Sequence, residues 1–416
     1  MVTEMKKWKE FRLGEICDIT SSKRIFAEQY VSEGIPFYRQ KEIIELHSNQ
    51  QLSEPLFISN EVYKTLKEKF GAPQSGDLLI TAVGVTLGIP YYVSNGDFYF
   101  KDGNLIWMKN FSKEINSKFL FYWIDSKSGW ESIYMRAIGS AQPALTIDLL
   151  KKYKLPFPSR KVQDKIASIL STYDNLIQNY KKQIEDLQTC ASELYKEWFI
   201  RFRFPGHKTT QFENGIPVGW EYVQLKDILK FDRGISYSSE EIDCEDGVNL
   251  INLKNIEAYG GFRRDGTKKY NGKYKTEQVV TQGDLVMGIT DMTQDRRTVG
   301  SVALIPYVDG ICVISADLLK VTTSISKTFF YSLCKFGPYS RYFSMFANGA
   351  NVLHLRPDAL LRKKVLLPSD KLISKYDSIV KPMVEKMDKA NIEIDNLTQQ
   401  RDLLLPRLMS GKLEVQ

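Results

Sequence analysis

The side chains that most often carry acid–base, nucleophilic or metal chemistry are few in this sequence and far apart. The three histidines, His47, His207 and His354, fall in separate predicted elements, so a histidine-based metal site is not expected. The sequence contains no glycine-rich phosphate loop, no dinucleotide-binding fingerprint and no Gly-x-Ser-x-Gly nucleophile motif. The Asn/Asp-Pro-Pro-Tyr/Phe motif of amino-methyltransferases is also missing. We therefore expect no catalytic residue, no metal and no cofactor on this chain.

Two Gly-Asp pairs, Gly76-Asp77 and Gly283-Asp284, are the nearest approach to a recurring acid. Leu-Leu follows the first pair and Leu-Val follows the second, so a turn that leads into a strand is the simpler interpretation of both. The chain has five cysteines, an odd number, and none has Cys-x-x-Cys spacing. We expect them to be reduced and mostly buried, as in a cytoplasmic protein.

Basic and amide side chains gather in the predicted loops of both halves of the chain. Arginine can bind guanine, and asparagine or glutamine can bind adenine, each through two hydrogen bonds, whereas lysine and serine mainly hold phosphate. Any one such side chain is more often a solvated surface group, but the clusters occur at matched positions in the two halves. The candidate DNA contacts are Lys23, Arg24, Arg39, Lys41, Arg136, Ser140, Gln142, Arg233, Lys254, Asn255, Arg263, Arg264, Lys268, Gln294, Arg296, Arg297, Asn348 and Asn351.

Composition limits the class of protein. With 416 residues, 43% of them apolar, the chain is long enough for more than one domain with a sizeable core. It has no apolar run long enough to span a membrane and no signal-peptide pattern at its start. A formal net charge of +7 is compatible with a nucleic-acid partner without requiring one.

The elements that would position the loops occur twice in the chain. Trp8–Ile16 returns as Trp220–Ile228, and Gly139–Leu155 returns as Gly349–Val365. The Gly-Asp pairs recur at nearly the same spacing, which is roughly 210 residues throughout. A duplicated chain without catalytic residues is typical of a binding protein whose ligand also has two parts.

Each half is expected to be mixed α/β with short strands. Apolar runs between turn residues predict strands at 78–81, 89–93 and 105–108 in the first half, and at 285–289, 302–305 and 318–321 in the second. A helix is predicted at 117–124, opened by a serine cap, and a matching helix at 326–333.

After Pro158 and again after Pro368 the apolar period changes to alternating steps of three and four, which indicates a coiled-coil seam. Polar residues fill the other faces, so each helix needs a partner, and the nearest candidate is the other helix of the same chain. About 40 helical residues at ~1.5 Å per residue span roughly 60 Å. Leu176 and Arg401 also fall on these stripes, Arg401 as an interruption. The residues predicted to pack against the partner helix are Ile166, Ile169, Tyr173, Tyr180, Ile184, Leu187, Leu194, Ile379, Met383, Met387, Ile394 and Leu397.

The predicted fold class is therefore α/β (mixed α+β). Two globular domains are separated by two long antiparallel coiled-coil helices, and the internal repeat makes the halves pseudo-two-fold related. An antiparallel pair would place Gln416 near Met1. Two domains on a flexible tether, each with its own helix, are the alternative arrangement.

The order of these motifs, twice over, resembles the specificity subunit of a Type I restriction–modification system, over essentially the whole chain. The motifs that carry the resemblance are the openings at 8–16 and 220–228, the Gly-Asp-Leu elements, Gly139–Leu145, the Leu-Pro borders and the closing segment Leu404–Leu413. The resemblance assigns 1–159 and 206–369 as target recognition domains 1 and 2. It assigns 160–205 and 370–416 as the central and distal conserved coiled-coil helices.

The resemblance further implies that each domain reads one half of a bipartite, asymmetric DNA target, with the helices as a ruler and a platform. The implied partners are double-stranded DNA, two modification (methyltransferase) subunits that bind S-adenosylmethionine and methylate adenine N6, and restriction/translocase subunits, with no membrane. The two halves differ in their loops, because an insertion around Gln294–Thr298 has no equivalent between Ala82 and Gly88. An enzyme with an unrecognised motif and a coiled-coil scaffold that binds only proteins are the rival classes.

Overall fold

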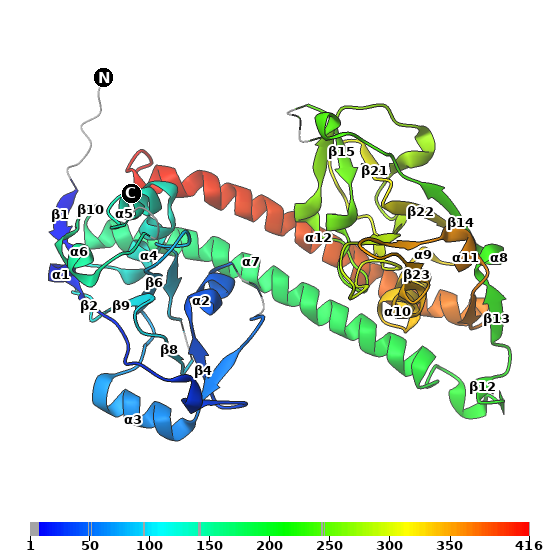
Figure 1. The fold of residues 1–416 in the computed structure, drawn as a ribbon, viewed down its shortest axis with the longest axis horizontal. Coiled ribbons are helices and arrows are strands. Elements are labelled where there is room, and N and C mark those ends of the chain that lie inside the picture. The colour runs from blue at the N-terminus through cyan, green and yellow to red at the C-terminus, as the bar shows by residue number, and fades with distance from the viewer. Residues whose placement is uncertain are drawn as a thin grey trace. The chain divides into compact units, whose positions relative to one another are not determined.

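The computed structural model describes residues 8–48, 50, 52–94, 96–139, 143–242, 244 and 246–415 (Figure 1). The chain forms two compact units. The first contains residues 1–178 and 395–416, and the second contains residues 179–394. Each unit is a globular mixed α/β domain together with parts of two long helices. No helix in the described part of the chain is long and apolar enough to cross a membrane.

The first unit is built on a four-stranded antiparallel sheet whose central strand is fully buried. The sheet has the order β2 (Asp18–Thr20), β9 (Leu105–Lys109), β6 (Leu78–Thr81), β7 (Pro90–Tyr92). A second sheet has the order β3 (Tyr30–Val31), β5 (Leu56–Ile58), β4 (Ile35–Tyr38), β8 (Tyr99–Phe100), and β1 (Lys9–Arg12) pairs with β10 (Lys154–Phe157). The helices are α1 (Leu13–Ile16), α2 (Gln40–His47), α3 (Asn60–Phe70), α4 (Ser117–Asp125), α5 (Lys127–Tyr134) and α6 (Ile147–Lys152).

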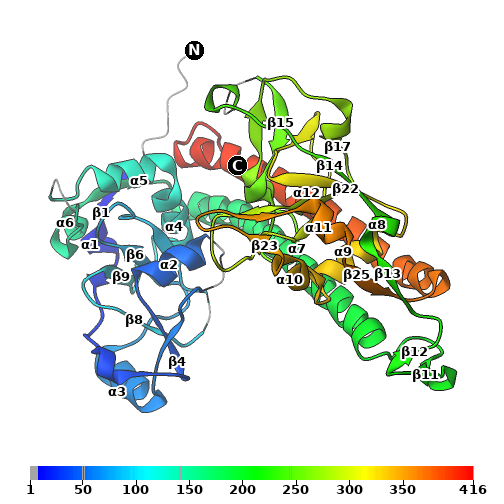
Figure 2. The ribbon, with the colours of Figure 1, turned by 45° about the vertical axis from the view of Figure 1, so that its right-hand side comes forward.

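The second unit repeats this plan with additions (Figure 2). Its antiparallel sheet has the order β14 (Leu229–Arg233), β22 (Leu318–Thr323), β18 (Leu285–Gly288), β20 (Val302–Leu304). The next sheets are β16 (Lys268–Tyr270), β15 (Val248–Ile251), β21 (Cys312–Ile314), β17 (Val279–Val280), and then β19 (Thr290–Asp291), β24 (Leu353–Leu355), β23 (Ala347–Asn348). Strand β11 (Phe212–Glu213) pairs with β12 (Ile216–Pro217), and β13 (Glu221–Gln224) pairs with β25 (Lys364–Leu367). Its short helices are α8 (Leu225–Ile228), α9 (Lys327–Lys335), α10 (Tyr339–Ser344) and α11 (Pro357–Leu361).

The topology confirms the internal repeat that the sequence predicts. The sheet order β2-β9-β6-β7 corresponds to β14-β22-β18-β20, and the parallel pair β4–β8 corresponds to β15–β21. All six predicted strand segments are strands, and both predicted helices form. The predicted serine cap of the first helix is wrong, because the Asn116 side chain accepts from the Phe119 amide at 3.1 Å and Ser117 is the first helical residue. Ser326 does cap α9.

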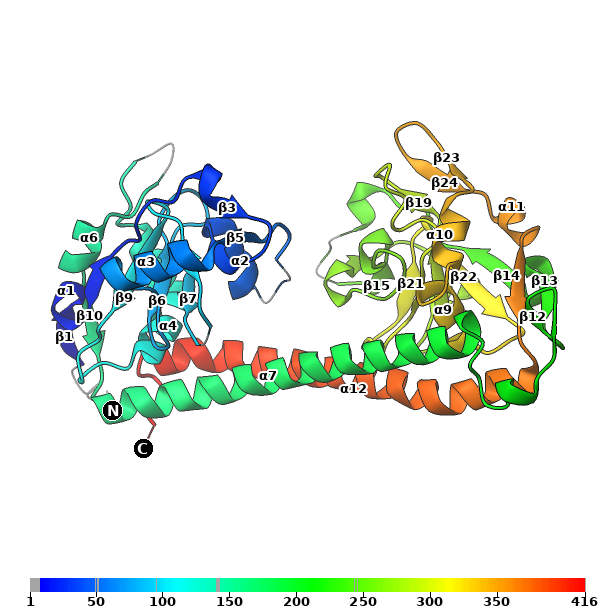
Figure 3. The ribbon, with the colours of Figure 1, turned by 90° about the horizontal axis from the view of Figure 1, so that it is seen from below.

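The two long helices are α7 (Arg160–Tyr195), which continues into a π-helical turn at Lys196–Ile200, and α12 (Asp370–Met409) (Figure 3). In the first unit, Arg401 of α12 donates to Asp174 of α7 at 2.9 Å, and Ile166 of α7 shares a core with Leu408 of α12. Residues later in α7 therefore meet residues earlier in α12, and the pair is antiparallel. Arg401, which interrupts the apolar stripe, is a bridge between the helices.

Burial along the helices departs from the predicted seam at two positions. Leu176 and Ile379 are exposed, whereas the neighbouring residues Ile177 and Val380 are buried. Val380 belongs to the core of the second domain, together with Phe329. Each helix thus packs against a globular domain as well as against its partner helix, and a single seam cannot describe its whole buried surface.

The first unit is closed by the end of α12. Leu408 and Met409 are buried in the core of the first domain, and Leu404 packs against that core. Gly411 lies against the indole of Trp8, where an added Cβ would come within 3.2 Å of the ring. Met1 and Gln416, which we expected to be neighbours, lie outside the described residues.

Candidate nucleic-acid interface

In the second unit, the buried carboxylate of Asp291 fixes the two ends of the loop between β19 and β20. Asp291 Oδ1 accepts from the backbone amide and the hydroxyl of Thr293, both at 2.8 Å. Its other oxygen, Oδ2, accepts from the amide of Thr298 at 2.7 Å and from its hydroxyl at 2.8 Å. Burial acts to raise the pKa of Asp291, but these four hydrogen bonds outweigh it and the pKa is lowered. The two ends of the loop are thereby clamped, and most of the residues between them, 292–297, are exposed.

This loop joins the turn of the β23–β24 hairpin. Gln294 Nε2 donates to the carbonyl of Ala350 at 2.7 Å, and Arg296 Nη1 donates to the carbonyl of Met345 at 3.5 Å. The structure therefore brings together five predicted contacts from two segments of the second half. They are Gln294, Arg296, Arg297, Asn348 and Asn351.

The surroundings of this composite surface are also basic. The Arg297 guanidinium pairs with Asp295 at 2.7 Å, and its backbone carbonyl accepts from the amide of Tyr259 at 2.8 Å. The guanidinium of Arg341 lies over the Tyr259 ring at 4.7 Å. Arg341, which lies within α10, is an exposed cation that we did not predict.

The matching turn in the first unit is held from a different element. Gln40 of α2 donates through Nε2 to the carbonyl of Val83 at 2.8 Å and to the hydroxyl of Thr86 at 2.9 Å. Val83 and Ile138 both form bridges with Ala144. Gln40 belongs to the same predicted cluster of basic and amide residues as Arg39 and Lys41, but its anchoring role depends on long-range contacts that sequence spacing does not show.

The remaining first-unit candidates are mostly engaged within the domain. Arg24 pairs with Asp102 at 3.0 Å, Lys41 pairs with Glu54 at 3.1 Å, and Lys23 Nζ lies 4.9 Å from the centre of the Phe70 ring. Arg136 is exposed, and its guanidinium stacks on Tyr153 at 4.0 Å. Ser140 and Gln142 lie outside the described residues.

Arg39 is tied to a carboxylate that has no exposure to solvent. The guanidinium donates to Glu42 at the start of α2, and the Arg39 amide donates to Glu42 Oε2 at 2.7 Å. The hydrogen bond to Glu42 raises the pKa of Arg39. Releasing Arg39 to a DNA phosphate would leave a buried charge unpaired, so its structural contact takes precedence.

The structure corrects two predicted DNA contacts of the second unit. Asn255 is buried, and the side chain of Arg264 points toward α12. Asn255 is fully buried, and its amide donates to the carbonyl of Arg263 at 2.8 Å and to the Thr267 hydroxyl at 2.9 Å. It holds a loop together and cannot reach a base. Arg264 donates to the carbonyl of Tyr307 at 2.9 Å and lies 3.7 Å from Asp388 of α12, so it faces the helix rather than solvent.

The other second-unit candidates stay at the surface or in strand β16. Arg263 pairs with Asp265 at 2.8 Å, Arg233 donates to the carbonyl of Ala316 at 3.5 Å, and Lys254 is exposed. Lys268 begins β16 and is half-buried.

Aspartates on the long helices hold each domain in place, and sequence reasoning missed them. In the first unit, Asp174 accepts from the hydroxyl of Tyr122 in α4 as well as from Arg401. Burial is the largest cause of a raised pKa at Tyr122, so its hydroxyl remains protonated as a donor. In the second unit, Asp388 accepts from Gln282 at 2.6 Å and from the Tyr307 amide at 3.1 Å.

The Gly-Asp aspartates close turns before strands. Asp77 accepts from the Gln74 amide at 2.9 Å and from the indole of Trp107 at 2.8 Å. Asp284 accepts from the Thr281 amide at 3.0 Å and pairs with Lys327 at 2.8 Å. Among the residues that the structure describes, no group of three or more histidine, cysteine, aspartate or glutamate side chains could hold a metal ion.

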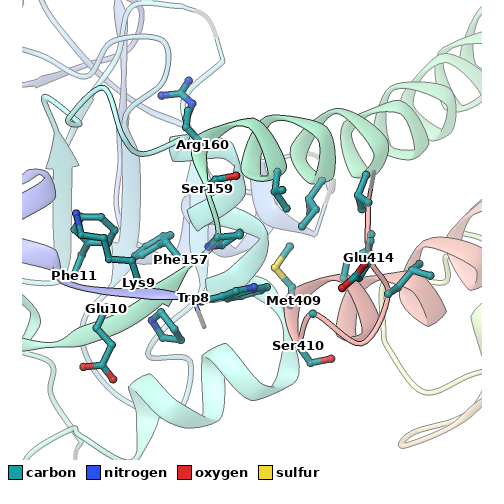
Figure 4. A pocket seen from close by; sticks show the side chains of 18 of the residues that line it. Trp8, Lys9, Glu10, Phe11, Phe157, Ser159, Arg160, Met409, Ser410 and Glu414 are labelled. Atoms are coloured by element: carbon teal, nitrogen blue, oxygen red, sulfur yellow. The ribbon is translucent and has the colours of Figure 1, made fainter. Parts of the chain in front are cut away.

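A cavity of about 1020 Å³ lies in the first unit. It is lined by β1, the start of α7 and the end of α12, and Figure 4 shows Trp8 beside Met409 there. Lys9, Arg160 and Glu414 form part of its polar edge. The cavity therefore lies where the end of α12 packs against the first domain.

A mixed α/β domain repeated along two long antiparallel helices is the class of fold that this chain adopts. A crystal structure of the S subunit of a type I restriction–modification system from M. genitalium superposes with a TM-score of 0.64 at 18% identity, covering 98% of this chain and 97% of that one. The family model for the type I restriction modification DNA specificity domain matches residues 5–189.

Curated relatives agree with that match. The Type I restriction enzyme MjaIX specificity subunit of Methanocaldococcus jannaschii is 29% identical over 315 residues, which are 72% of this chain and 70% of the relative. The Type I restriction enzyme HindI specificity subunit of Haemophilus influenzae is 22% identical, covering 98% of this chain and all of the relative (100%). Residues 5–189 thus match the family of type I specificity domains, and over most of its length the chain is similar to type I restriction enzyme specificity subunits.

Proposed function

We propose that this chain selects the DNA target of a type I restriction–modification complex by reading a bipartite, asymmetric sequence, one half with each domain. The observation that carries the proposal is the pairing of a repeated frame with unlike loops. The 292–297 loop of the second domain is clamped by Asp291, whereas the turn at 83–86 of the first is held by Gln40. Two readers with different surfaces suit two different half-sites.

The proposed partners follow from the family rather than from a site on this chain. Two modification subunits would bind S-adenosylmethionine and methylate adenine N6, and restriction subunits would join them to translocate and cleave DNA. This chain would contribute recognition without catalysis and would hold no cofactor of its own. Because its target is genomic DNA, we propose a cytoplasmic location.

The DNA contacts that we now favour are the surfaces where loops converge. In the second domain they are Gln294, Arg296, Arg297, Asn348 and Asn351, to which we add Arg341. In the first domain they are Lys41 and Arg136 beside the turn that Gln40 holds. Carboxylate partners such as Asp295 can exchange for phosphate, because both are anions that arginine binds bidentately.

The test is a genome-wide map of methylated adenine in a strain that carries this chain and its modification partner, compared with the same strain lacking this chain. We expect one bipartite motif that depends on the chain. The double variant Arg296→Ala/Arg297→Ala should reduce methylation without altering the other half of the motif. Purified chain that modifies or cuts DNA by itself would show an enzyme instead. An assembled complex without sequence preference would show a protein scaffold.

A further inference from the structure

Beside its proposed reading loop, each domain exposes one large apolar side chain in a strand loop and one at a helix end, and the first domain adds Ile138, which is 60% exposed. In the first domain, Val85 and Met135 are each 84% exposed. In the second, Met292 is 78% exposed and Met345 is 67% exposed. A single exposed apolar side chain is ordinary on a protein surface. A pair at the same place in both domains is a repeated feature that needs an explanation.

The two pairs occupy corresponding positions in the fold. Met135 is the C-cap of α5, and Met345 is the C-cap of α10, the second of the two short helices in each domain. Val85 lies in the turn that follows β6, and Met292 lies in the loop that follows β19. In each domain, therefore, one exposed apolar side chain lies at the end of a helix and one lies in the loop that follows a strand.

The surroundings of these side chains are polar and basic. Met292 directly follows the Asp291 clamp, and the Met345 carbonyl accepts from Arg296 at 3.5 Å. In the first domain, Val85 borders a shallow hollow of about 610 Å³ that Gln40 and Lys41 also line. Cations at the edge of such a surface favour a polyanion as its occupant.

We propose that Val85 and Met135 in the first domain, and Met292 and Met345 in the second, contact the C5-methyl groups of thymine in their half-sites. In the major groove, thymine presents a methyl group beside hydrogen-bonding edges, so a reader needs apolar atoms next to amide and guanidinium donors. Methionine suits this role because its flexible, polarisable side chain adapts to a neighbouring apolar group. The inference rests on the proposed function and adds an apolar component to the reading of sequence.

The experiment uses the full chain assembled with its modification partner, and a duplex bearing the target that methylation mapping identifies. Thymines in one half-site at a time are replaced by deoxyuridine, which removes the methyl group and keeps the base pair. Each lost contact should weaken binding by about fourfold. In the Met292→Ala/Met345→Ala variant, deoxyuridine in the second domain's half-site should have no further effect, and the other half-site should respond as before. Met345→Leu should retain the response to deoxyuridine.

Val218→Ala, which shortens another exposed apolar side chain of the second domain, is the matched control and should bind both duplexes like the unaltered chain. Equal responses of the unaltered chain and the double variant to deoxyuridine, with sequence-specific binding intact, would overturn the methyl contact and leave the proposed function standing. Failure of the unaltered complex to bind any sequence selectively would instead overturn the proposed function. Loss of assembly with the modification partner in the double variant would identify the pair as a protein-docking surface and also overturn the inference.

Discussion

The two domains share one frame but fix their loops by different means. In the second domain, Asp291 clamps both ends of its loop from within the same connection. In the first domain, the corresponding turn is held by Gln40, which comes from a separate helix. The sheets and helix pairs carry the repeat, whereas loop anchorage has diverged. A change to one anchor should therefore affect one half of the target and leave the other half alone.

The prediction with the largest expected effect tests the long helices as a ruler. Removing one heptad from each helix, residues 179–185 and 390–396, keeps the antiparallel register set by Asp174 and Arg401. It shortens each helix by about 10 Å, equivalent to about three base pairs. Methylation mapping should show both half-sites retained with a shorter spacer. Retention of the original spacer would exclude the ruler.

The next prediction removes one anchor. Asp291→Ala leaves the amides of Thr293 and Thr298 without their acceptor. We expect discrimination at one half-site to fall by about tenfold or more, since an unmade hydrogen bond of this kind costs roughly 1–3 kcal/mol. Competition binding with single-base variants of the target measures the effect. Asp265→Ala, which removes an exposed carboxylate of the same domain, is the control.

The counterpart in the first domain is Gln40→Ala, which releases Val83 and Thr86. It should relax the opposite half-site by a smaller factor, because Gly84 and the Thr81 hydroxyl still hold that turn. The same competition assay applies. If both variants relaxed the same half-site, the assignment of one half to each domain would be wrong.

A smaller effect is expected where a domain meets its helices. Arg401→Ala removes the cation that Asp174 accepts from and should destabilise the first unit by about 1–2 kcal/mol. Urea unfolding, followed by the fluorescence of the tryptophans, measures the loss. Arg263→Ala, at an exposed pair in the second unit, should change stability by less than about 0.5 kcal/mol. Equal effects would show that the helix junction contributes no more than a surface ion pair.

The smallest effect concerns pH. Because the folded pKa of Asp291 lies below its ordinary value, the ionised carboxylate stabilises the folded state. This contribution is fully present above the unfolded pKa of about 3.9 and is lost as the pH falls through the lowered folded value. Stability measured between neutral pH and acid should therefore fall less steeply for Asp291→Asn than for the unaltered chain. Parallel curves of stability against pH would show that the ionised carboxylate of Asp291 does not stabilise the folded state.

Much of the frame could be predicted from the sequence because buried strands and paired helices leave apolar patterns. The runs at 78–81 and 285–289 mark the central strands for this reason. Periodicity wrongly predicted burial at Leu176 and Ile379, because each helix packs against a domain as well as against the other helix. An apolar stripe indicates which face of a helix is buried, but it does not indicate which partner covers that face.

The roles of side chains in the loops were harder to predict, because residue type does not determine the direction in which a side chain points. Asn255 has the same amide as Asn351, yet it is buried and satisfies backbone groups, whereas Asn351 is exposed. The anchoring role of Gln40 was not predicted because its acceptors lie more than forty residues away, at 43 and 46 positions along the chain. Such contacts depend on the folded path of two segments, which no local pattern contains.

The closure of the first domain by α12 has a consequence for protein synthesis. Residues 179–394, which make up the second unit, are contiguous, whereas the first unit needs residues 395–416 as well as 1–178. A ribosome therefore releases every residue of the second unit before it releases those that complete the core of the first. The domain whose synthesis begins first is therefore the last to have all of its residues available, and until then the surface around Trp8 lacks its cover of Leu408 and Met409.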